Sequence, residues 1–138
     1  MTDMNPIVWD DGLTLHIPEI DAQHKRLVGI VNQLIEIQDQ EDSDDEMTHI
    51  LGALTHYIGE HFETEEQMMI DHGYPLRETH REEHQAFVAQ TAYYIATYRK
   101  GGALLKKELL RFLKNWLVAH IGKTDAAFGA FLGTRGLR

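Results

Sequence analysis

Residues 43–71, SDDEMTHILGALTHYIGEHFETEEQMMID, decide the fold, because their apolar residues recur at the three- and four-residue spacing of one α-helical face. This apolar stripe consists of Met47, Ile50, Leu54, Ile58, Phe62 and Met69. Ser43 and Glu46 have the spacing of a capping box, so we expect the helix to begin there. Gly73, just beyond the segment, is a suitable C-terminal stop. The segment therefore predicts one long amphipathic helix.

Three further segments have the same helical period. They are 20–38, with Ile20, Leu27, Val31 and Leu34; 75–101, with Phe87, Thr91, Tyr94, Ile95 and Tyr98; and 103–121, with Leu105, Leu109, Leu113, Trp116 and Leu117. We expect Asp21 near the start of the first helix as a cap or dipole partner, and Pro75 in the first turn of the third. Gly101-Gly102 should end that third helix. Short connections between long amphipathic helices predict an all-α fold, an antiparallel up-down-up-down four-helix bundle.

The flanking segments complete a single expected domain over residues 1–138, whose bundle occupies about residues 20–125. Residues 1–19 form an arm, which we expect to pack on the bundle as a strap. Residues 126–138 predict a short C-terminal helix with a frayed end. The apolar residues of the arm are Trp9, Leu13, Leu15 and Ile17.

Composition excludes several classes of protein. The 138 residues include no cysteine, which removes disulfides, zinc ribbons, thiolate nucleophiles and cysteine-ligated iron–sulfur clusters. A formal charge of −9 argues against nucleic-acid binding, which needs a basic surface. The N-terminus lacks the basic and apolar regions of a signal peptide, and no apolar run is long enough to span a membrane. We therefore expect a soluble, cytoplasmic protein, and a monomer.

The sequence contains nine histidines, and five of them fall on the inward helical stripes. These are His24, His61 with Glu65 four residues later, His80 with His84 four residues later, and His120, so that each of the four helices contributes. Asp125 follows His120 by five residues, which on a regular α-helix would place it about 140° away. If Asp125 joins this cluster, we expect the chain to unwind near Gly122, which would place Asp125 at or beyond the helix end.

The chemistry of these side chains favours a metal centre, because an inward carboxylate is costly to bury unless it is paired or bound to metal. Five imidazoles and two carboxylates without a thiolate suit iron, and also manganese, zinc or copper. Seven ligands are too many for one ion and predict two. With two bridging carboxylates and one bridging oxygen, two six-coordinate ions would keep one open position, which suits reversible binding of a small diatomic molecule.

The ordered motifs resemble those of single-domain bacterial hemerythrins. The matching blocks are Trp9; Ile20-Asp21-Ala22-Gln23-His24-Lys25; His61-Phe62-Glu63-Thr64-Glu65-Glu66; Tyr74-Pro75; His80-x-x-x-His84-x-x-Phe87; and Trp116-Leu117-x-x-His120-Ile121-x-x-x-Asp125. They run in order over residues 7–125, and every one of the seven ligand positions holds the expected type of residue. Each block alone is weak evidence, whereas the ordered set is specific.

This resemblance implies a non-haem di-iron centre with a bridging oxo or hydroxo group, which binds O2 reversibly for transport, storage or delivery to an oxygen-consuming enzyme. By position, His80, His84 and His120 would hold one iron, and His24 and His61 the other. Glu65 and Asp125 would bridge them. The O2 pocket would be walled by Phe62, Trp116, Leu117 and Ile121, and the protein itself would not be an enzyme.

Other interpretations stay open at this point. His80-Arg81-Glu82-Glu83-His84 fits the inverted zinc-protease motif H-x-x-E-H, but that motif would leave the other inward ligands unexplained. Glu46-x-x-His49 matches one of the two Glu-x-x-His motifs of ferritin-like di-iron oxidases. An O2, redox or iron sensor would need an output from a partner protein. The remaining histidines, His16, His49, His56 and His72, are expected at the surface or in helix caps, and the acidic stretch 39–46 is expected to be a solvated connection.

Overall fold

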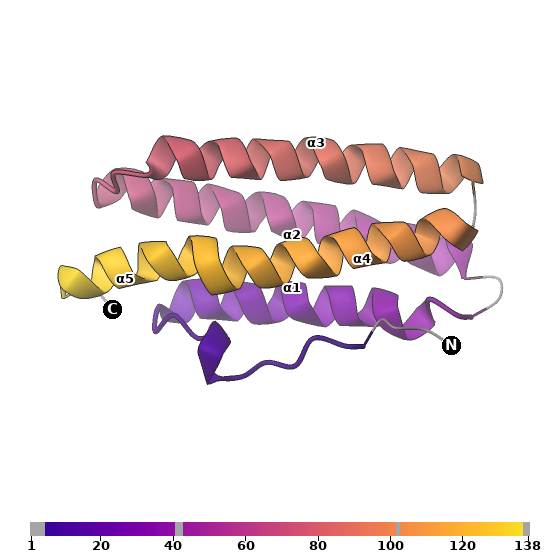
Figure 1. Ribbon diagram of the computed structural model, residues 1–138, viewed down its shortest axis with the longest axis horizontal. Coiled ribbons are helices and arrows are strands. Elements are labelled where there is room, and N and C mark those ends of the chain that lie inside the picture. Colours follow the sequence, from indigo (N-terminus) through magenta and orange to yellow (C-terminus); the bar gives the residue numbers. More distant parts are fainter. Residues whose placement is uncertain (1–4, 41–42, 102, 137–138) are drawn as a thin grey trace.

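The described part of the chain is helical, with no strand, and its long helices form the expected four-helix bundle (Figure 1). The computed structural model describes residues 5–40, 43–101 and 103–136, for residues 103–105 the backbone alone. The helices are α1 (Pro18–Ile37), α2 (Asp44–Asp71), α3 (Arg77–Gly101), α4 (Ala103–Ala119) and α5 (Ala126–Thr134), with a 3-10 turn at Asp11–Leu13 and a π-helical segment at His120–Asp125. None of the described helices is long and apolar enough to cross a lipid bilayer.

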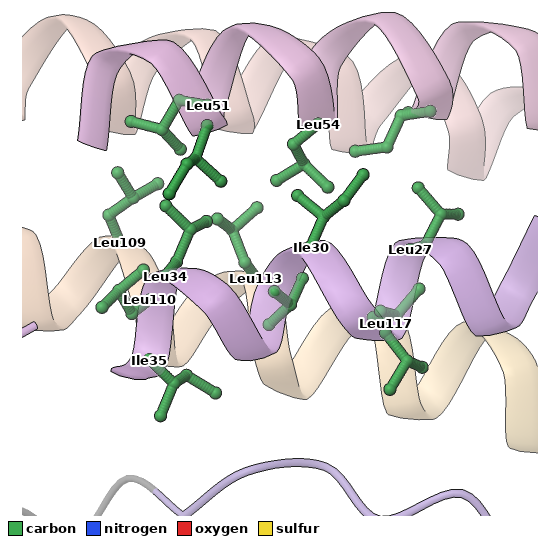
Figure 2. Packing of buried hydrophobic residues seen from close by; sticks show 14 of the residues in the cluster. Leu27, Ile30, Leu34, Ile35, Leu51, Leu54, Leu109, Leu110, Leu113 and Leu117 are labelled. Atoms are coloured by element: carbon green, nitrogen blue, oxygen red, sulfur yellow. The ribbon is translucent and has the colours of Figure 1, made fainter. Parts of the chain in front are cut away.

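The apolar core lies between α1, α2 and α4, where leucine and isoleucine side chains interlock (Figure 2). Leu34, Leu109 and Leu110 are fully buried there. Burying each such side chain stabilises the fold by about 1.5–3 kcal/mol. The core positions predicted from the helical stripes are buried or half-buried, except that the side chain of Leu105 lies outside the described residues. Helix α3 ends at Gly101 as predicted, and Gly102 of the same predicted stop lies outside the described residues. The apolar core thus packs the helices against one another around the predicted stripes.

The start of α2 differs from the prediction. Ser43 precedes the helix but makes no side-chain capping bond, so the predicted capping box with Glu46 is wrong. The Ser43 hydroxyl instead accepts a hydrogen bond from the buried Lys106 ammonium of α4 at 3.1 Å. A buried ammonium group needs an acceptor, and this need takes priority over the cap.

The end of α2 follows the prediction, because Gly73 has a φ of +65°, a conformation that glycine adopts without strain. The Tyr74 N–H bonds the Met69 carbonyl at 2.9 Å and the Gly73 N–H bonds the Ile70 carbonyl at 3.3 Å, which is a Schellman motif. Tyr74 and Met69 also share an apolar cluster with α5. The glycine thus turns the chain sharply at this end of the bundle.

Pro75 does not lie in the first turn of α3, as the sequence suggested, since that helix begins at Arg77. The Arg77 N–H bonds the Tyr74 carbonyl at 3.2 Å, so Pro75 occupies the second position of a tight turn. Proline is favoured there because its ring already fixes the required φ. Proline lacks an N–H, which costs nothing either in the first turn of a helix or at the second position of a tight turn. Sequence alone therefore did not distinguish these two positions.

The arm packs along the bundle as a strap, as expected (Figure 1). The Asn32 side chain of α1 holds Ile7 by both backbone groups: the Ile7 N–H donates to Asn32 Oδ1 at 2.8 Å, and Asn32 Nδ2 donates to the Ile7 carbonyl at 2.9 Å. Asp21 lies in the first turn of α1, which suits the helix dipole. However, it does not cap the helix: its carboxylate accepts from the Leu15 N–H at 2.9 Å and fixes the arm instead.

Replacing Asn32 by leucine should detach the arm, because both backbone groups of Ile7 lose their partner. We expect a loss of about 1–3 kcal/mol in the free energy of unfolding, measured by urea denaturation. Faster amide exchange confined to the arm should accompany it. Gln33→Leu, at the exposed neighbouring position, is the matched control and should change neither quantity. Equal exchange in both variants would show that this contact does not hold the arm.

Candidate metal centre

All seven ligand-type residues predicted from sequence converge at one buried point of the bundle. Each is at most 3% exposed. They fall into two overlapping groups whose candidate ligand atoms lie within 4.8 Å of one another. One group is His24, His61, Glu65, His120 and Asp125, and the other is Glu65, His80, His84, His120 and Asp125. The two groups share Glu65, Asp125 and His120, and each of them could hold a metal ion.

Asp125 reaches the cluster because the chain forms a π-helical segment after His120. Its Oδ2 lies 2.8 Å from His120 Nε2 and 2.7 Å from His24 Nε2. A π-helix bonds residues five apart, so it aligns the two side chains that an α-helix would separate. The chain departs from the regular α-helix near Gly122, as expected, and Asp125 lies beyond the end of α4; the departure is a π-helical segment that leads directly into α5.

Several donor atoms form no well-aligned hydrogen bond with one another, whereas a cation could bind all of them. Glu65 Oε2, Asp125 Oδ1 and the Nε2 atoms of His80 and His84 are buried without a well-formed hydrogen bond. His80 Nε2 lies 2.9 Å from Asp125 Oδ1, close but poorly aligned for such a bond. Buried polar atoms are rarely left unpaired. Four unsatisfied donors and acceptors at one point indicate a ligand that accepts electron pairs from all of them.

The pKa values of the cluster also favour a metal cation at this point. Burial lowers the pKa of His61 to about 4 and that of His84 to about 2, so both are neutral imidazoles, the form that binds metals. Burial and the neighbouring Asp125 carboxylate raise the pKa of Glu65. Burial also opposes charge on His120, but Asp125 and Glu65 raise its pKa to about 10. The proton on His120 thus compensates the buried carboxylate charge, a role that a metal cation would take over.

Two side chains outside the cluster orient its histidines. His61 Nδ1–H donates to Gln23 Oε1 at 2.9 Å, and Gln23 Nε2 donates to the Thr64 hydroxyl at 3.1 Å. His84 Nδ1–H donates to the Glu66 carboxylate at 2.9 Å. Both bonds leave Nε2 free to face the cluster, which is the usual arrangement behind metal-ligating histidines. Sequence reasoning did not assign these roles, although Gln23 and Glu66 each stand next to a predicted ligand.

The residues proposed as a pocket wall surround the cluster on one side. The Phe62 ring stacks on His84 with centroids 3.6 Å apart, and the Trp116 ring stacks on His120 at 4.5 Å. Leu117 and Ile121 are buried in the same apolar cluster as Phe62. Phe62 and Trp116 thus contact donor rings directly, whereas Leu117 and Ile121 belong to the apolar core around them.

The structure does not support the two competing motifs, because their glutamates lie away from the cluster. Glu83 of the H-x-x-E-H pattern is exposed, while its two histidines turn inward to the shared cluster. Glu46 and His49 of the ferritin-like pattern are both exposed and far along α2 from the donors. Among the other histidines, His16, His49 and His56 are exposed, and His72 caps the C-terminus of α2, as expected.

Comparison with known proteins agrees with this geometry. Residues 15–132 match the family model described as the hemerythrin HHE cation binding domain. The chain belongs to the hemerythrin family. It is 33% identical to a bacteriohemerythrin of Pseudomonas aeruginosa (strain LESB58) over 91% of this chain and 80% of the relative. It is also 33% identical to a bacteriohemerythrin of Methylococcus capsulatus (strain Bath) over 81% of this chain and 85% of that one.

Solved structures extend the match to the hemerythrin fold itself. A crystal structure of a leucine-to-phenylalanine mutant superposes with a TM-score of 0.81 at 29% identity, covering 92% of this chain and 97% of the other. Hemerythrins are non-haem iron-binding, oxygen-binding domains, so the buried cluster of this hemerythrin has the surroundings and the donors of an iron site.

Replacing Gln23 by leucine should weaken metal retention about 10–100-fold, because His61 loses the partner that fixes its ring. Competition with a chelator, followed by metal analysis, measures this loss. Gln23→Glu keeps the acceptor oxygen and should retain more metal than Gln23→Leu. Gln67→Leu, on the exposed face of α2, is the control and should behave as the unmodified protein. Identical retention in all variants would remove Gln23 from the site.

Proposed function

We propose that this hemerythrin binds O2 reversibly at a pair of non-haem iron ions. His80, His84 and His120 would hold one ion, and His24 and His61 the other. Glu65 and Asp125 would bridge the two, together with an oxo or hydroxo group. When bound, the ferrous pair supplies the electrons for reversible O2 binding. The observation that supports this assignment most strongly is the pair of overlapping donor groups, which share Glu65, Asp125 and His120.

The protein contributes a dry, apolar surrounding to this reaction. Beyond the seven donors, the buried polar side chains of the described residues are Gln38, Ser43, Thr91 and Lys106. Gln38, Ser43 and Lys106 belong to the other end of the bundle, where α1 ends and α2 and α4 begin. Phe62 and Trp116 pack directly on ligand rings instead. Such a wall admits a small apolar molecule and excludes the water that would promote irreversible oxidation.

This surrounding favours carriage over catalysis. Among the described residues, no buried acid or base lies beside the seven donors, and general acid–base catalysis needs a group within hydrogen-bond reach of the substrate. We therefore assign transport, storage or delivery of O2 to an oxygen-consuming enzyme. Sensing through a partner protein, or oxidase or peroxidase turnover, is the alternative. Cycling O2 at constant protein, compared with turnover of added peroxide, separates carriage from catalysis.

The purified protein should contain about two irons per chain, as the two donor groups require. The reduced protein should gain charge-transfer absorption with O2 and lose it again under vacuum over repeated cycles. Metal analysis and anaerobic optical spectroscopy measure both. One zinc per chain would contradict the di-iron assignment, and irreversible bleaching would contradict carriage.

Leu117→Ala should accelerate autoxidation of the oxygenated protein several-fold, because the shortened side chain opens the wall to water. The same change should cost about 2–5 kcal/mol in the free energy of unfolding, so folding is checked by urea denaturation. Val118→Ala, at the exposed neighbouring position of α4, is the matched control and should change neither rate nor stability appreciably. If the two variants autoxidise equally, Leu117 belongs only to the core.

A further inference from the structure

A cavity of about 570 Å³ lies between α2 and α3, beside the metal centre but separate from its donors. Its lining residues are Thr55, Ile58, Gly59, Phe87, Val88, Thr91, Ala92, Ile95, Ala96 and Arg99. We call it the α2–α3 groove. Seven residues of this lining are apolar or glycine, and none is acidic. Pockets of this size and character are typical of sites for small organic ligands.

Two polar groups in the groove have no partner among the described residues. The Thr91 hydroxyl is buried without a hydrogen bond, and the residue is 6% exposed. Threonine hydroxyls inside helices commonly bond the carbonyl four residues earlier, as Thr55 does to Leu51 at 2.9 Å. At the far end of the groove, Arg99 forms no ion pair with any residue of the described ranges. The groove thus offers one buried hydroxyl without a hydrogen bond and one guanidinium along an apolar floor.

The spacing of these groups defines the shape of a ligand. Phe87 and Arg99 are 12 residues apart on α3, which corresponds to about 18 Å along the helix axis. Thr91 lies one turn from Phe87, at the inner part of the groove. An elongated apolar molecule with one anionic end matches this order of apolar floor and terminal cation.

We propose that the α2–α3 groove binds an alkyl carboxylate, a free medium-chain fatty acid. The carboxylate pairs with the Arg99 guanidinium, a planar donor suited to that group. The alkyl chain lies over Ile95 and Ala92 and ends against Phe87 and Ile58. This site does not depend on the proposed iron centre for its chemistry.

The inner end of the groove nevertheless touches the surroundings of the metal centre. Phe87 stacks on Trp116 with ring centroids 3.7 Å apart and lies 6.0 Å from Phe62, the ring that stacks on His84. A chain pressed against Phe87 would change the environment of Trp116, so tryptophan fluorescence reports occupancy of the groove.

The test is a calorimetric titration of the purified protein with dodecanoate, in the metal-free and the iron-loaded forms. We expect saturable binding of one dodecanoate per chain in both forms, accompanied by a change in Trp116 fluorescence. Gly59→Leu fills the groove, since Gly59 lines it and nothing lies within 4 Å of an added Cβ. It should weaken binding at least tenfold. Gly29→Leu on α1 is the matched control, because nothing lies within 4 Å of its Cβ either, and it should bind as the unmodified protein.

The carboxylate is tested separately. The unmodified protein should prefer dodecanoate to dodecanol by about tenfold, and Arg99→Gln should abolish this preference while dodecanol binding persists. Absence of saturable binding, or equal binding in the Gly59→Leu and Gly29→Leu variants, would overturn the proposal. Binding only to the iron-loaded form would likewise overturn it, by placing the carboxylate on the metal. A chain that binds no iron but passes these tests would contradict the proposed function alone.

Discussion

The structure depends on the burial of two carboxylates among five imidazoles at the centre of an apolar bundle. Charges in such surroundings are costly unless they are paired, and pairing among these residues leaves several atoms unsatisfied. The cluster therefore adds little stability by itself. Its cost is offset by the apolar core, where leucine and isoleucine side chains from α1, α2 and α4 interlock (Figure 2). Stability and chemistry are thus supplied by different side chains of the same helices.

The π-helical segment shows how the backbone adapts to this cluster. The chain after α4 must bring both a histidine and an aspartate to one point, although they are five residues apart in the sequence. The π-helical segment brings the two side chains together and leads directly into α5. Phe128 and Leu132 of α5 then pack in one apolar cluster with Tyr74. Irregular π turns are rare and occur frequently at functional sites. Here the irregularity has a definite consequence, because it brings His120 Nε2 within 2.8 Å of Asp125 Oδ2.

Periodicity was sufficient to predict the bundle and the inward donors, because both depend on which residues share a helical face. The Gly73 stop was also predictable, since a left-handed residue strongly favours glycine. The predictions for Ser43 and Pro75 were wrong for a common reason. Each residue type suits two local positions, and a distant partner or a neighbouring turn selects between them. The spacing of His120 and Asp125 indicated that the regular helix is interrupted between them, but a rule that assumes 3.6 residues per turn could not predict that the interruption is a π-helical segment.

The partners of the ligand rings follow another geometric rule. A residue next to an inward donor points about 100° away on the helix, toward the adjacent helix rather than the core. Gln23, beside His24 on α1, therefore meets His61 on α2, and Glu66, beside Glu65 on α2, meets His84 on α3. Each bond joins two helices and fixes one ring. The packing of α1, α2 and α3 is consequently coupled to ligand orientation, so the bundle presents its donors in place before a cation enters, and less ordering is needed upon binding.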